Sequence, residues 1–179
     1  MTSLVSFNSF SFELPVRYKP IKFLCIGSFS SVILAEDTKT NENVAIKKLN
    51  DIIDFVEAKF VLNEITLMKF LSHENILDLK DVIYFPPKKN PKKNLIVGEI
   101  YLVNSFMECD LAQIIRHKAH LTSDHVQYII YKLLKALFYM HSAGVIHKEI
   151  KPSNILINEN TEIKLWFFKV VLILTLINS

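Results

Sequence analysis

Short apolar runs dominate the first half of the chain and predict β-strands. Residues 21–26, 30–35 and 44–49 are apolar or alternate between apolar and polar side chains, and turn-forming residues separate them. Two more strands are predicted at residues 79–85 and 99–105. The first half of the chain is therefore predicted to be rich in β-sheet.

Two further segments have the spacing of helices. Residues 52–71 predict a helix whose apolar positions are Phe60, Val61, Ile65, Met68 and Leu71. A second helix is capped by Thr122 or Ser123 and stops at Gly144. One face of this helix carries Val126, Ile129, Ile130, Leu133, Leu134, Leu137 and Met140. A break near residues 106–110 separates the sheet-rich part from this helical part and favours two lobes.

Three segments depart from these patterns. Residues 1–15 hold six Phe, Leu or Val side chains without clean periodicity, and we expect a loosely ordered arm that docks one or two aromatic rings. Residues 86–94 contain four lysines, which is typical of a solvated hairpin tip. Residues 165–179 are apolar at 11 of 15 positions, too short a run for a bilayer-spanning helix of about 20 residues. This segment is either a buried strand, an aggregation-prone stretch or sequence outside the fold.

Composition narrows the class of protein. The chain has 179 residues, half of them apolar, so it has enough apolar surface to bury a core. A net charge of +3 is too small to indicate nucleic acid or an acidic membrane surface as the main partner. Cys25 and Cys109 form no disulfide framework or metal-ligand pattern, and residues 1–15 lack the features of a secretory signal. We expect an intracellular protein, cytoplasmic or nuclear, without a membrane anchor.

Two segments of the sheet-rich half carry candidate chemistry. Residues 24–32 place Gly27 and small side chains in a turn between strands, where backbone N–H groups can approach phosphate oxygens. Lys47 lies in an apolar strand, and burial of its charge requires a negative partner such as Glu64. Each feature alone has an ordinary structural explanation, since glycines are common in hairpins and strand lysines often keep the amino group in water.

The segment after the capped helix is the most informative. It reads His147-Lys148-Glu149-Ile150-Lys151-Pro152-Ser153-Asn154. A carboxylate, a lysine two positions on and an amide three positions further on form a compact set. Such a set can accept a hydroxyl proton, neutralise a phosphate and ligate Mg²⁺.

In combination, these segments resemble the eukaryotic protein kinases, and among them the mitogen-activated protein (MAP) kinases. The kinase pattern is a Gly-rich loop, Val-Ala-Ile-Lys, a helix Glu and His-Arg-Asp-x-Lys-x-x-Asn, and each occurs here in order. The segments that resemble MAP kinases in particular are Arg17-Tyr18-Lys19-Pro20, VAIKKL at 44–49, His73-Glu74-Asn75-Ile76, MECDL at 107–111, HSAGVIH at 141–147 and KPSNIL at 151–156. The resemblance covers about residues 12–164.

The resemblance implies a fold and a division of the chain. The fold is α+β and two-lobed like a protein kinase, with a complete N-lobe and only the first part of the C-lobe. The implied domains are an N-terminal arm at 1–16, the N-lobe at 17–106, the start of the C-lobe at 107–164 and an apolar tail at 165–179. In such a fold the helix around residues 126–140 packs against a later helix, so we expect its apolar stripe to face water here.

The resemblance also implies a nucleotide site. ATP is the implied ligand, with Gly27 covering the phosphates, Lys47 gripping them and Glu64 holding Lys47. Asn104 is the implied gatekeeper beside adenine, and Asp110 reaches the ribose. The other implied nucleotide-binding residues are Leu24, Val32, Ala45, Met107, Ser153 and Leu156.

The implied reaction is transfer of the ATP γ-phosphate to Ser or Thr of a protein substrate. Glu149 occupies the place of the catalytic-base Asp, Lys151 contacts the γ-phosphate and Asn154 binds Mg²⁺. The implied partners are ATP and a protein substrate or partner kinase, with nucleic acid excluded and a membrane disfavoured.

Departures from the kinase pattern predict low or absent activity. Glu149 is longer than Asp by one C–C bond, about 1.5 Å, and a misplacement of about 1 Å can cost on the order of 10²-fold in rate. Lys148 replaces Arg, and Cys25 and Ser30 replace two glycines of the loop. Phe167 stands where the family places the Mg²⁺-binding Asp, and an aromatic ring cannot ligate Mg²⁺.

The resemblance breaks off at residues 164–165, so we expect a kinase domain truncated after the catalytic loop, either as a genuine product or through an altered gene model. The alternative function is a non-catalytic pseudokinase that binds nucleotide, or an interaction module.

Overall fold

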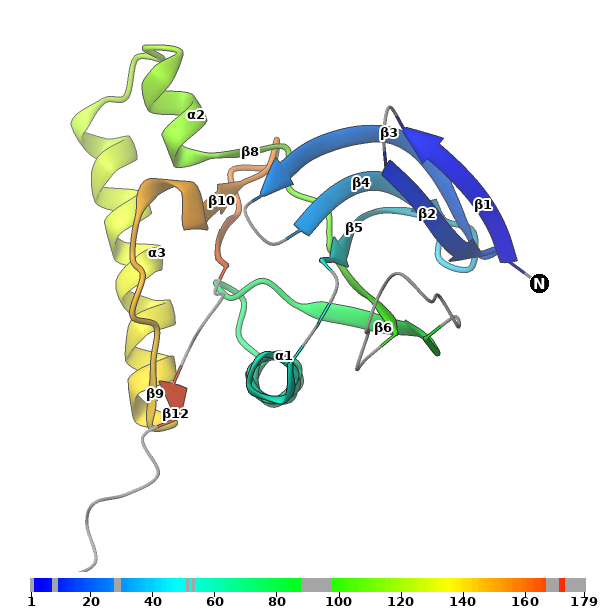
Figure 1. The fold of residues 1–179 in the computed structure, drawn as a ribbon. Helices are drawn as coiled ribbons and strands as arrows, with labels where there is room; N and C mark the ends of the chain where they lie inside the picture. The colour runs from blue at the N-terminus through cyan, green and yellow to red at the C-terminus, as the bar shows by residue number, and fades with distance from the viewer. Residues whose placement is uncertain are drawn as a thin grey trace, which may run out of the picture. The chain divides into compact units, whose positions relative to one another are not determined.

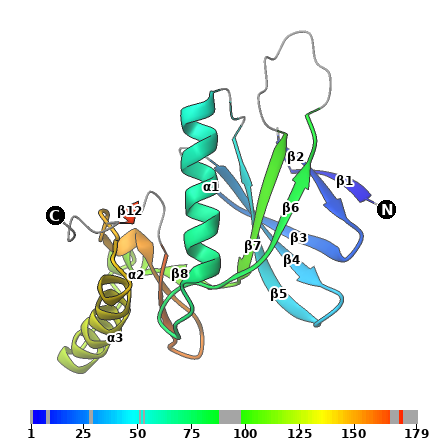
Figure 2. The same cartoon turned by 90° about the horizontal axis from the view of Figure 1, so that it is seen from below.

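The structure is a computed structural model in which the chain divides into two compact units (Figures 1 and 2). Unit 1 comprises Met1–Leu62 and Leu79–Phe106, and unit 2 comprises Asn63–Asp78 and Met107–Ser179. The residues that the structure describes are 2–7, 10–27, 30–50, 52, 54–87, 98–166 and, for the backbone alone, 171–172. Parts of three predicted segments lie outside these residues: the loop after Gly27, the lysines of 86–94 and most of the apolar tail.

Unit 1 is built on a five-stranded antiparallel sheet with the order β3-β4-β5-β7-β6 (Figure 2). The strands are β3 (Tyr18–Gly27), β4 (Ser30–Asp37), β5 (Glu42–Leu49), β6 (Leu79–Phe85) and β7 (Glu99–Ser105). All five correspond to strands predicted from apolar runs, and β3 and β5 begin two or three residues earlier than predicted. Together with the helices of unit 2 they confirm the α+β prediction.

The N-terminal arm is a β-hairpin, so the prediction of a loosely ordered segment was wrong. β1 (Thr2–Phe7) and β2 (Phe10–Pro15) pair antiparallel from Thr2 opposite Pro15 to Phe7 opposite Phe10. Phe12 and Leu14 of β2 are completely buried and belong to the core of unit 1. The ring of Phe10 stacks on Phe23 of β3 with 5.8 Å between ring centres.

Polar contacts fasten the hairpin to the sheet. The Lys48 amino group of β5 donates to the Ser11 carbonyl at 2.8 Å and pairs with the Glu99 carboxylate at 3.0 Å. The fully buried Tyr101 hydroxyl accepts from the Glu13 backbone N–H at 3.0 Å and donates to Glu99. The bonds of Tyr101 pair a buried hydroxyl that would be costly to leave without a partner, whereas the bond of Lys48 lies at the exposed side of the hairpin.

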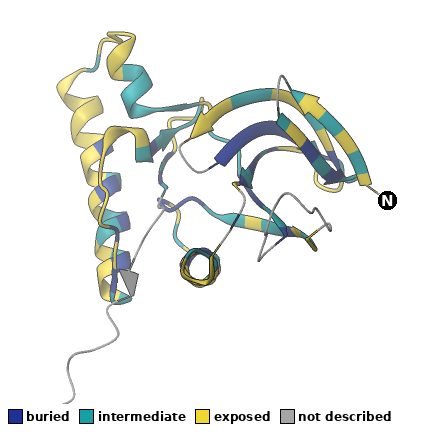
Figure 3. Ribbon diagram, in the orientation of Figure 1, coloured by how far each residue is buried: buried dark blue, intermediate teal, exposed yellow. Residues whose placement is uncertain are grey.

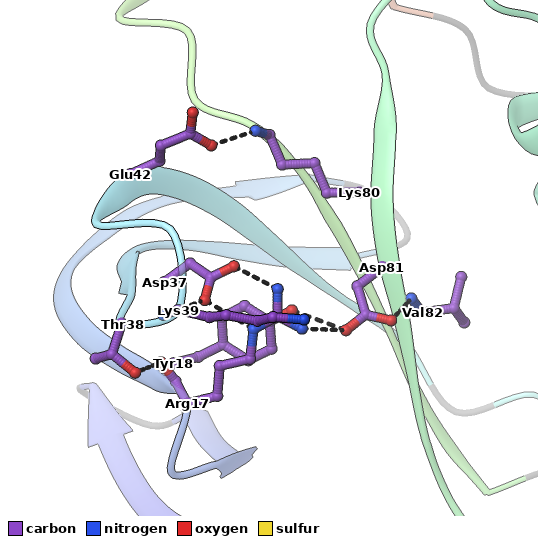
Figure 4. Close-up of polar contacts among 9 residues, drawn as sticks. All are labelled: Arg17, Tyr18, Asp37, Thr38, Lys39, Glu42, Lys80, Asp81 and Val82. Carbon is purple, nitrogen blue, oxygen red and sulfur yellow. Dashed lines mark hydrogen bonds and ion pairs between the residues drawn. The ribbon is translucent and has the colours of Figure 1, made fainter.

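A charged network joins the start of β3 to the end of β4 and to β6 (Figure 4). The Arg17 guanidinium donates to both Asp37 carboxylate oxygens, at 2.7 and 2.6 Å, and its third nitrogen lies 3.4 Å from Asp81. The Tyr18 hydroxyl donates to Asp81 at 2.8 Å, and Thr38 donates to the Arg17 carbonyl. The hydrogen bonds from Arg17 lower the pKa of the buried Asp37 carboxyl below its usual range.

Helix α1 (Phe55–Phe70) lies between β5 and β6 in the chain and crosses the division between the units. It begins after Asp54, whose carboxylate accepts from the Glu57 backbone N–H at 2.7 Å. The helix is shorter than the predicted 52–71, and Phe60 is 64% exposed although the apolar pattern placed it on the buried face. The side chains that α1 and its end do bury are Val61, Glu64, Leu67, Met68 and Leu71.

The loop between α1 and β6 belongs to unit 2 and is bound to a strand far along the chain. The Asn75 side chain is 4% exposed and donates to the Ile163 carbonyl at 2.9 Å. The Leu165 N–H donates to the Asn75 carbonyl at 2.8 Å, and the Leu77 N–H donates to the Leu165 carbonyl at 3.0 Å. This loop therefore pairs with strand β11 (Ile163–Leu165) almost as a further strand.

The remainder of unit 2 consists of helices and short strands. One small sheet has the order β11-β10-β8, and a second pairs β12 with β9. The elements are β8 (Cys109–Asp110), α2 (Leu111–Arg116), α3 (Ser123–Ser142), β9 (Val145–Ile146), the 3-10 helix η1 (Pro152–Asn154), β10 (Ile155–Ile157) and β12 (Val171–Leu172). β12 lies within the apolar tail, so the backbone of the tail contributes at least this pairing to unit 2.

Helix α3 begins and ends where the sequence predicts. Thr122 caps it by accepting from the His125 N–H, and the His125 ring accepts from the Thr122 N–H in return. Gly144 follows the helix with a φ of 70°, a conformation that favours glycine. The apolar side chains predicted for one face of α3 fall into two rows, one buried in unit 2 and the other exposed (Figure 3). The expectation that these side chains face water is therefore correct for the second row alone.

Among the described residues, no helix is both long and apolar enough to cross a membrane.

We predict that Arg17→Ala lowers the free energy of unfolding by about 2 kcal/mol at pH 7, because it leaves a buried carboxylate without its main partner. Asp37 has a folded-state pKa below its ordinary value of 3.8. Ionised Asp37 therefore contributes fully to the free energy of unfolding above about pH 3.8. This contribution is lost as the pH falls through the lower folded-state pKa. Urea unfolding at pH 7 and pH 3 measures both effects.

Arg116→Ala is the matched control, because Arg116 is exposed at the end of α2 and pairs with no carboxylate among the described residues. This variant should unfold within about 0.5 kcal/mol of the parent. Equal losses for the two arginine variants, or a loss for Arg17→Ala that grows at pH 3, would contradict the prediction.

Candidate functional site

The segment from His147 to Asn154 forms a tightly bonded loop between β9 and β10. The His147 side chain is 1% exposed, and its Nδ1 accepts from the Glu149 N–H at 3.2 Å. Its Nε2 lies 2.9 Å from the Trp166 carbonyl oxygen. Because Nδ1 accepts a hydrogen bond, Nε2 carries the proton of the neutral ring and donates it to Trp166. Burial lowers the pKa of His147, which favours this neutral form.

The predicted acid–base and phosphate-binding side chains meet in this loop. The Lys151 amino group lies 2.6 Å from a Glu149 carboxylate oxygen, and both side chains are about half exposed. The Asn154 side-chain amide donates to the Glu149 carbonyl at 2.8 Å, and the Asn154 N–H donates to the Lys151 carbonyl at 2.9 Å. The loop thus presents a carboxylate, an ammonium group and an amide oxygen within six residues, and Ser153 lies inside it in η1.

Lys148 has a backbone conformation that non-glycine residues rarely adopt. Its φ is 64°, in the left-handed region, at a cost of order 1–3 kcal/mol. The residues on either side are held by the bonds of His147 and Glu149 described above. The strained position lets the chain reverse direction between a buried histidine and an exposed carboxylate.

Two further predicted residues lie opposite each other in the small sheet of unit 2. Leu156 of β10 is paired with Asp110 of β8. Asp110 caps α2, with its carboxylate accepting from the Gln113 N–H at 2.8 Å and from the Gln113 side-chain amide at 3.1 Å. Sequence reasoning assigned Asp110 to the ribose, and the structure shows a capping role for the same carboxylate. Met107, at the start of unit 2, is partly buried.

The remaining predicted nucleotide-binding residues lie on the first three strands of the sheet in unit 1. Val32 of β4 is the register partner of Lys47 of β5, and both side chains are buried, at 8% and 4% exposure. Ala45 is partnered by Leu34 on one side and by Asn104 of β7 on the other. Leu24 and Gly27 belong to β3, which ends at Gly27 opposite Ser30.

The structure therefore gathers the predicted residues into two groups. The group in unit 1 consists of Leu24, Gly27, Val32, Ala45, Lys47 and Asn104. The group in unit 2 consists of Glu64, Met107, Asp110, Glu149, Lys151, Ser153, Asn154 and Leu156. Glu64 is buried at 6% exposure in the part of α1 that belongs to unit 2.

The donor set for Mg²⁺ in the described part of the chain is small. The Asn154 amide nitrogen is engaged with Glu149, which leaves Oδ1 as the atom suited to a cation. The described residues contain no group of three His, Cys, Asp or Glu side chains that could hold a metal ion. Phe167, in the predicted position of the second ligand, lies outside them. These residues fit a cation that is bound mainly through nucleotide phosphates.

Two residues that support the loop were not assigned this role by sequence reasoning. The Trp166 backbone binds the loop at two points, because its N–H donates to the Asn154 carbonyl at 2.8 Å and its carbonyl accepts from His147. Asn75 holds β11, the strand that leads directly to Trp166. A polar Asn within the run His73-Glu74-Asn75-Ile76 was the available signal, but nothing local identifies its distant partner.

These features together define a protein kinase domain: a five-stranded antiparallel sheet with one long helix, followed by a helical unit that carries a His-x-Glu-x-Lys-x-x-Asn loop. Comparison with known families agrees, because the family model described as "Protein kinase domain" matches residues 18–175. The chain belongs to the protein kinase domain family. The match also extends through much of the segment 165–179, which we expected to fall outside the kinase pattern.

Within this family the chain is similar to MAP kinases of plants. It is 42% identical over 159 residues to mitogen-activated protein kinase 5 of Arabidopsis thaliana, covering 88% of this chain and 41% of the relative. It is 40% identical over 159 residues to mitogen-activated protein kinase homolog MMK2 of Medicago sativa, with the same two coverages. Mitogen-activated protein kinase 4a of Physcomitrium patens is 39% identical over 86% of this chain and 40% of the relative. The chain spans about two fifths of the length of these relatives.

The buried histidine gives a testable prediction. His147→Gln should lower the free energy of unfolding by about 2 kcal/mol, because Gln cannot reproduce both of its hydrogen bonds in the same geometry. The folded-state pKa of His147 lies below its ordinary value. The neutral ring therefore contributes fully to the free energy of unfolding above about pH 6.5, and this contribution is lost as the pH falls through the folded-state pKa. Denaturant unfolding between pH 8 and pH 5 measures this dependence.

The exposed His141, at the end of α3, provides the control. His141→Gln should change stability by no more than about 0.5 kcal/mol. Nitrogen-15 NMR of the parent protein at pH 7 should show His147 neutral with its proton on Nε2. A charged ring at pH 7, or a proton on Nδ1, would refute the assignment.

Proposed function

We propose that this chain is the ATP-binding part of a serine/threonine protein kinase of MAP-kinase type. In this function the γ-phosphate of ATP is transferred to a Ser or Thr hydroxyl of a protein substrate. The observation that carries the proposal is the loop in which Glu149, Lys151 and Asn154 are held together by hydrogen bonds. This is the set of groups that phosphoryl transfer from ATP requires.

In unit 1, the proposal assigns the phosphates of ATP to Gly27 and Lys47. The Lys47 side chain is 4% exposed beside Val32, in a setting where an ammonium group requires anionic partners. We assign Leu24, Val32 and Ala45 to the adenine ring, since they present small or aliphatic side chains on three consecutive strands. Glu64 is assigned to the orientation of Lys47.

In unit 2, the proposal assigns proton transfer to Glu149. Its carboxylate is half exposed and can be reached by an incoming hydroxyl, whose proton it would accept, and the Lys151 ammonium group lies 2.6 Å from it. When the hydroxyl oxygen attacks the γ-phosphorus, the bond to the β-phosphate oxygen breaks and Lys151 neutralises negative charge on the transferred group. Met107, Asp110, Ser153 and Leu156 are assigned to the nucleotide.

Mg²⁺ would be held by Asn154 Oδ1 and the phosphates. When bound, it neutralises charge on the β- and γ-phosphates. Phe167 in place of Asp removes one oxygen ligand, and Glu149 in place of Asp moves the proton acceptor by about 1.5 Å. We therefore propose low or no transfer activity for the chain with this sequence.

A second candidate function is a non-catalytic pseudokinase that binds nucleotide, or a module that binds a partner kinase. The close pairing of Glu149 with Lys151, at 2.6 Å, favours this candidate because it engages the proton acceptor in an ion pair. The kinase and the pseudokinase share ATP as ligand, and all of these candidates have a protein as partner. For each of them we propose a cytoplasmic or nuclear location. Detectable transfer of phosphate by the purified chain would exclude the non-catalytic candidate.

The nucleotide assignment predicts that Lys47→Met abolishes binding of ATP. In the parent protein, millimolar ATP should raise the melting temperature, because a ligand that binds only the folded state stabilises it. The variant should lose most of this rise while keeping its fold by circular dichroism.

Lys22→Met serves as a control for the loss of one positive charge, since Lys22 is exposed on β3 of the same sheet. It should retain the full thermal shift. If ATP stabilises both lysine variants as it stabilises the parent, Lys47 has no part in nucleotide binding. If ATP never stabilises the parent, the kinase and the nucleotide-binding pseudokinase both fail, and the module that binds a partner kinase remains.

The Mg²⁺ assignment predicts that ATP affinity of the parent depends little on the metal. Phe167→Asp should make the affinity rise at least about tenfold when EDTA is replaced by Mg²⁺, because it restores a carboxylate ligand. Titration with a fluorescent ATP analogue in the two buffers measures this ratio. Phe168→Asp introduces the same charge one residue further along and should leave the ratio at the parent value. An equal effect of the two variants would show that position 167 is not a ligand position.

A further inference from the structure

The strand that carries Lys47 has two faces with different surroundings. Side chains alternate across a strand, so the neighbours Lys47 and Lys48 of β5 lie on opposite faces of the sheet. Lys47 is the register partner of Val32 on β4, and Lys48 is the register partner of Tyr101 on β7. The face of Lys47 carries side chains that we assign to ATP, whereas the face of Lys48 contacts the β1–β2 hairpin.

The hairpin packs against the back of the strands that carry these side chains. Ile33, Ile46 and Val103 lie on three neighbouring strands and are completely buried in one cluster with Phe12 and Leu14 of the hairpin. Each of the three sheet residues is next in sequence to a predicted nucleotide-site residue. The hairpin therefore supports the backbone from which the nucleotide-site side chains project on the other face.

Lys48 connects the hairpin, β5 and β7 through one amino group. This group donates to the Ser11 carbonyl at 2.8 Å, pairs with the Glu99 carboxylate at 3.0 Å and lies 5.4 Å from the centre of the Tyr101 ring. The Tyr101 hydroxyl accepts from the Glu13 N–H and donates to Glu99. In these bonds the hairpin contributes backbone groups and the sheet contributes side chains. We refer to Lys48, Glu99 and Tyr101 as the Lys48 network.

We propose that Lys48 is a positioning residue for nucleotide binding, because its contacts fix the twist of β5 and with it the place of the Lys47 amino group. This role rests on the proposed binding of ATP. Successive Cα atoms are only about 3.8 Å apart, so a rotation of β5 about its axis moves both lysine side chains. A strand that is already held in place leaves less to be ordered when ATP binds, which raises the affinity.

The apolar contacts and the Lys48 network contribute differently. Burial of Phe12 and Leu14 attaches the hairpin to the sheet, but apolar burial has little directional preference. Hydrogen bonds do have a preferred direction. From β5, Lys48 contacts the hairpin on one side and β7 on the other, so its bonds resist rotation of β5 against both. Its side chain is 18% exposed, and solvent therefore screens these charges only in part.

The test begins with the affinity of the full chain for a fluorescent ATP analogue, measured well below the melting temperature. Lys48→Met should raise the dissociation constant at least about fivefold, the lower end of the usual coupling between two sites. The circular dichroism spectrum should stay unchanged, because the apolar contacts still hold the hairpin. Lys48→Arg should restore the dissociation constant to within about twofold of the parent, since a guanidinium group can donate to both Ser11 and Glu99.

Lys80→Met is the matched control. Lys80 of β6 belongs to the same sheet and pairs with the Glu42 carboxylate at 2.7 Å (Figure 4). Among the described residues it has no bond to the hairpin, so the control removes one charge and one ion pair without touching the Lys48 network. This variant should bind the ATP analogue within about twofold of the parent.

Hydrogen exchange provides a second measurement, because coupling between two sites is reciprocal. Saturating ATP should slow exchange of the Glu13 backbone amide at least about fivefold in the parent, and it should have no such effect in Lys48→Met. An amide of Glu13 that ATP leaves unchanged in the parent would overturn the proposal.

The affinities separate a positioning role from a structural one. If Lys48→Met lowers the melting temperature but binds the ATP analogue as tightly as the parent, Lys48 serves stability alone and the inference is wrong, while the proposed function stands. Equal losses of affinity in Lys48→Met and Lys80→Met would assign the effect to charge and would also overturn it. A parent chain that binds no ATP overturns the inference together with the proposed binding of ATP.

Discussion

The position of the candidate catalytic loop depends on one buried side-chain amide, that of Asn75. This residue lies in the loop after α1, yet it donates to Ile163, which is 88 residues further along the chain. Its carbonyl accepts from Leu165, so both ends of strand β11 are fixed by a single residue. A hydrogen bond of this kind contributes only about 1 kcal/mol in itself. Its importance comes from what β11 carries.

β11 leads directly to Trp166, and the backbone of Trp166 binds the catalytic loop at His147 and at Asn154. Three segments that are distant in sequence thus converge on the loop through backbone groups. Side-chain identity at Trp166 matters little for these bonds, whereas the path of its backbone matters greatly. The loop can therefore keep its shape while individual functional side chains change, which is consistent with Glu149 in the place of Asp.

The sequence was a reliable guide where a pattern is local. The strands and α3 follow from alternation, periodicity and the Thr122 cap, and the kinase family follows from motifs that occur in order. The hairpin β1–β2 was missed although Phe10, Phe12 and Leu14 alternate perfectly, because the Phe and Ser residues before them blur the period. The role of Asn75 could not be predicted, since no local pattern encodes a partner 88 residues away. The exposure of Phe60 shows the same limit, because periodicity identifies a face without identifying what covers it.

The β1–β2 hairpin limits how many N-terminal residues can be removed from this domain. The family match begins at residue 18, but the hydrophobic core of unit 1 already begins at Phe12 and Leu14. Removing the residues before the family boundary would uncover Ile33, Ile46 and Val103, which are completely buried beneath or beside the hairpin's side chains in the same cluster. A domain truncated at residue 18 would expose an apolar surface and would be prone to aggregate during expression. The hydrophobic core of unit 1 therefore includes the first strands of the chain, and the limits of the family match are not the limits of this core.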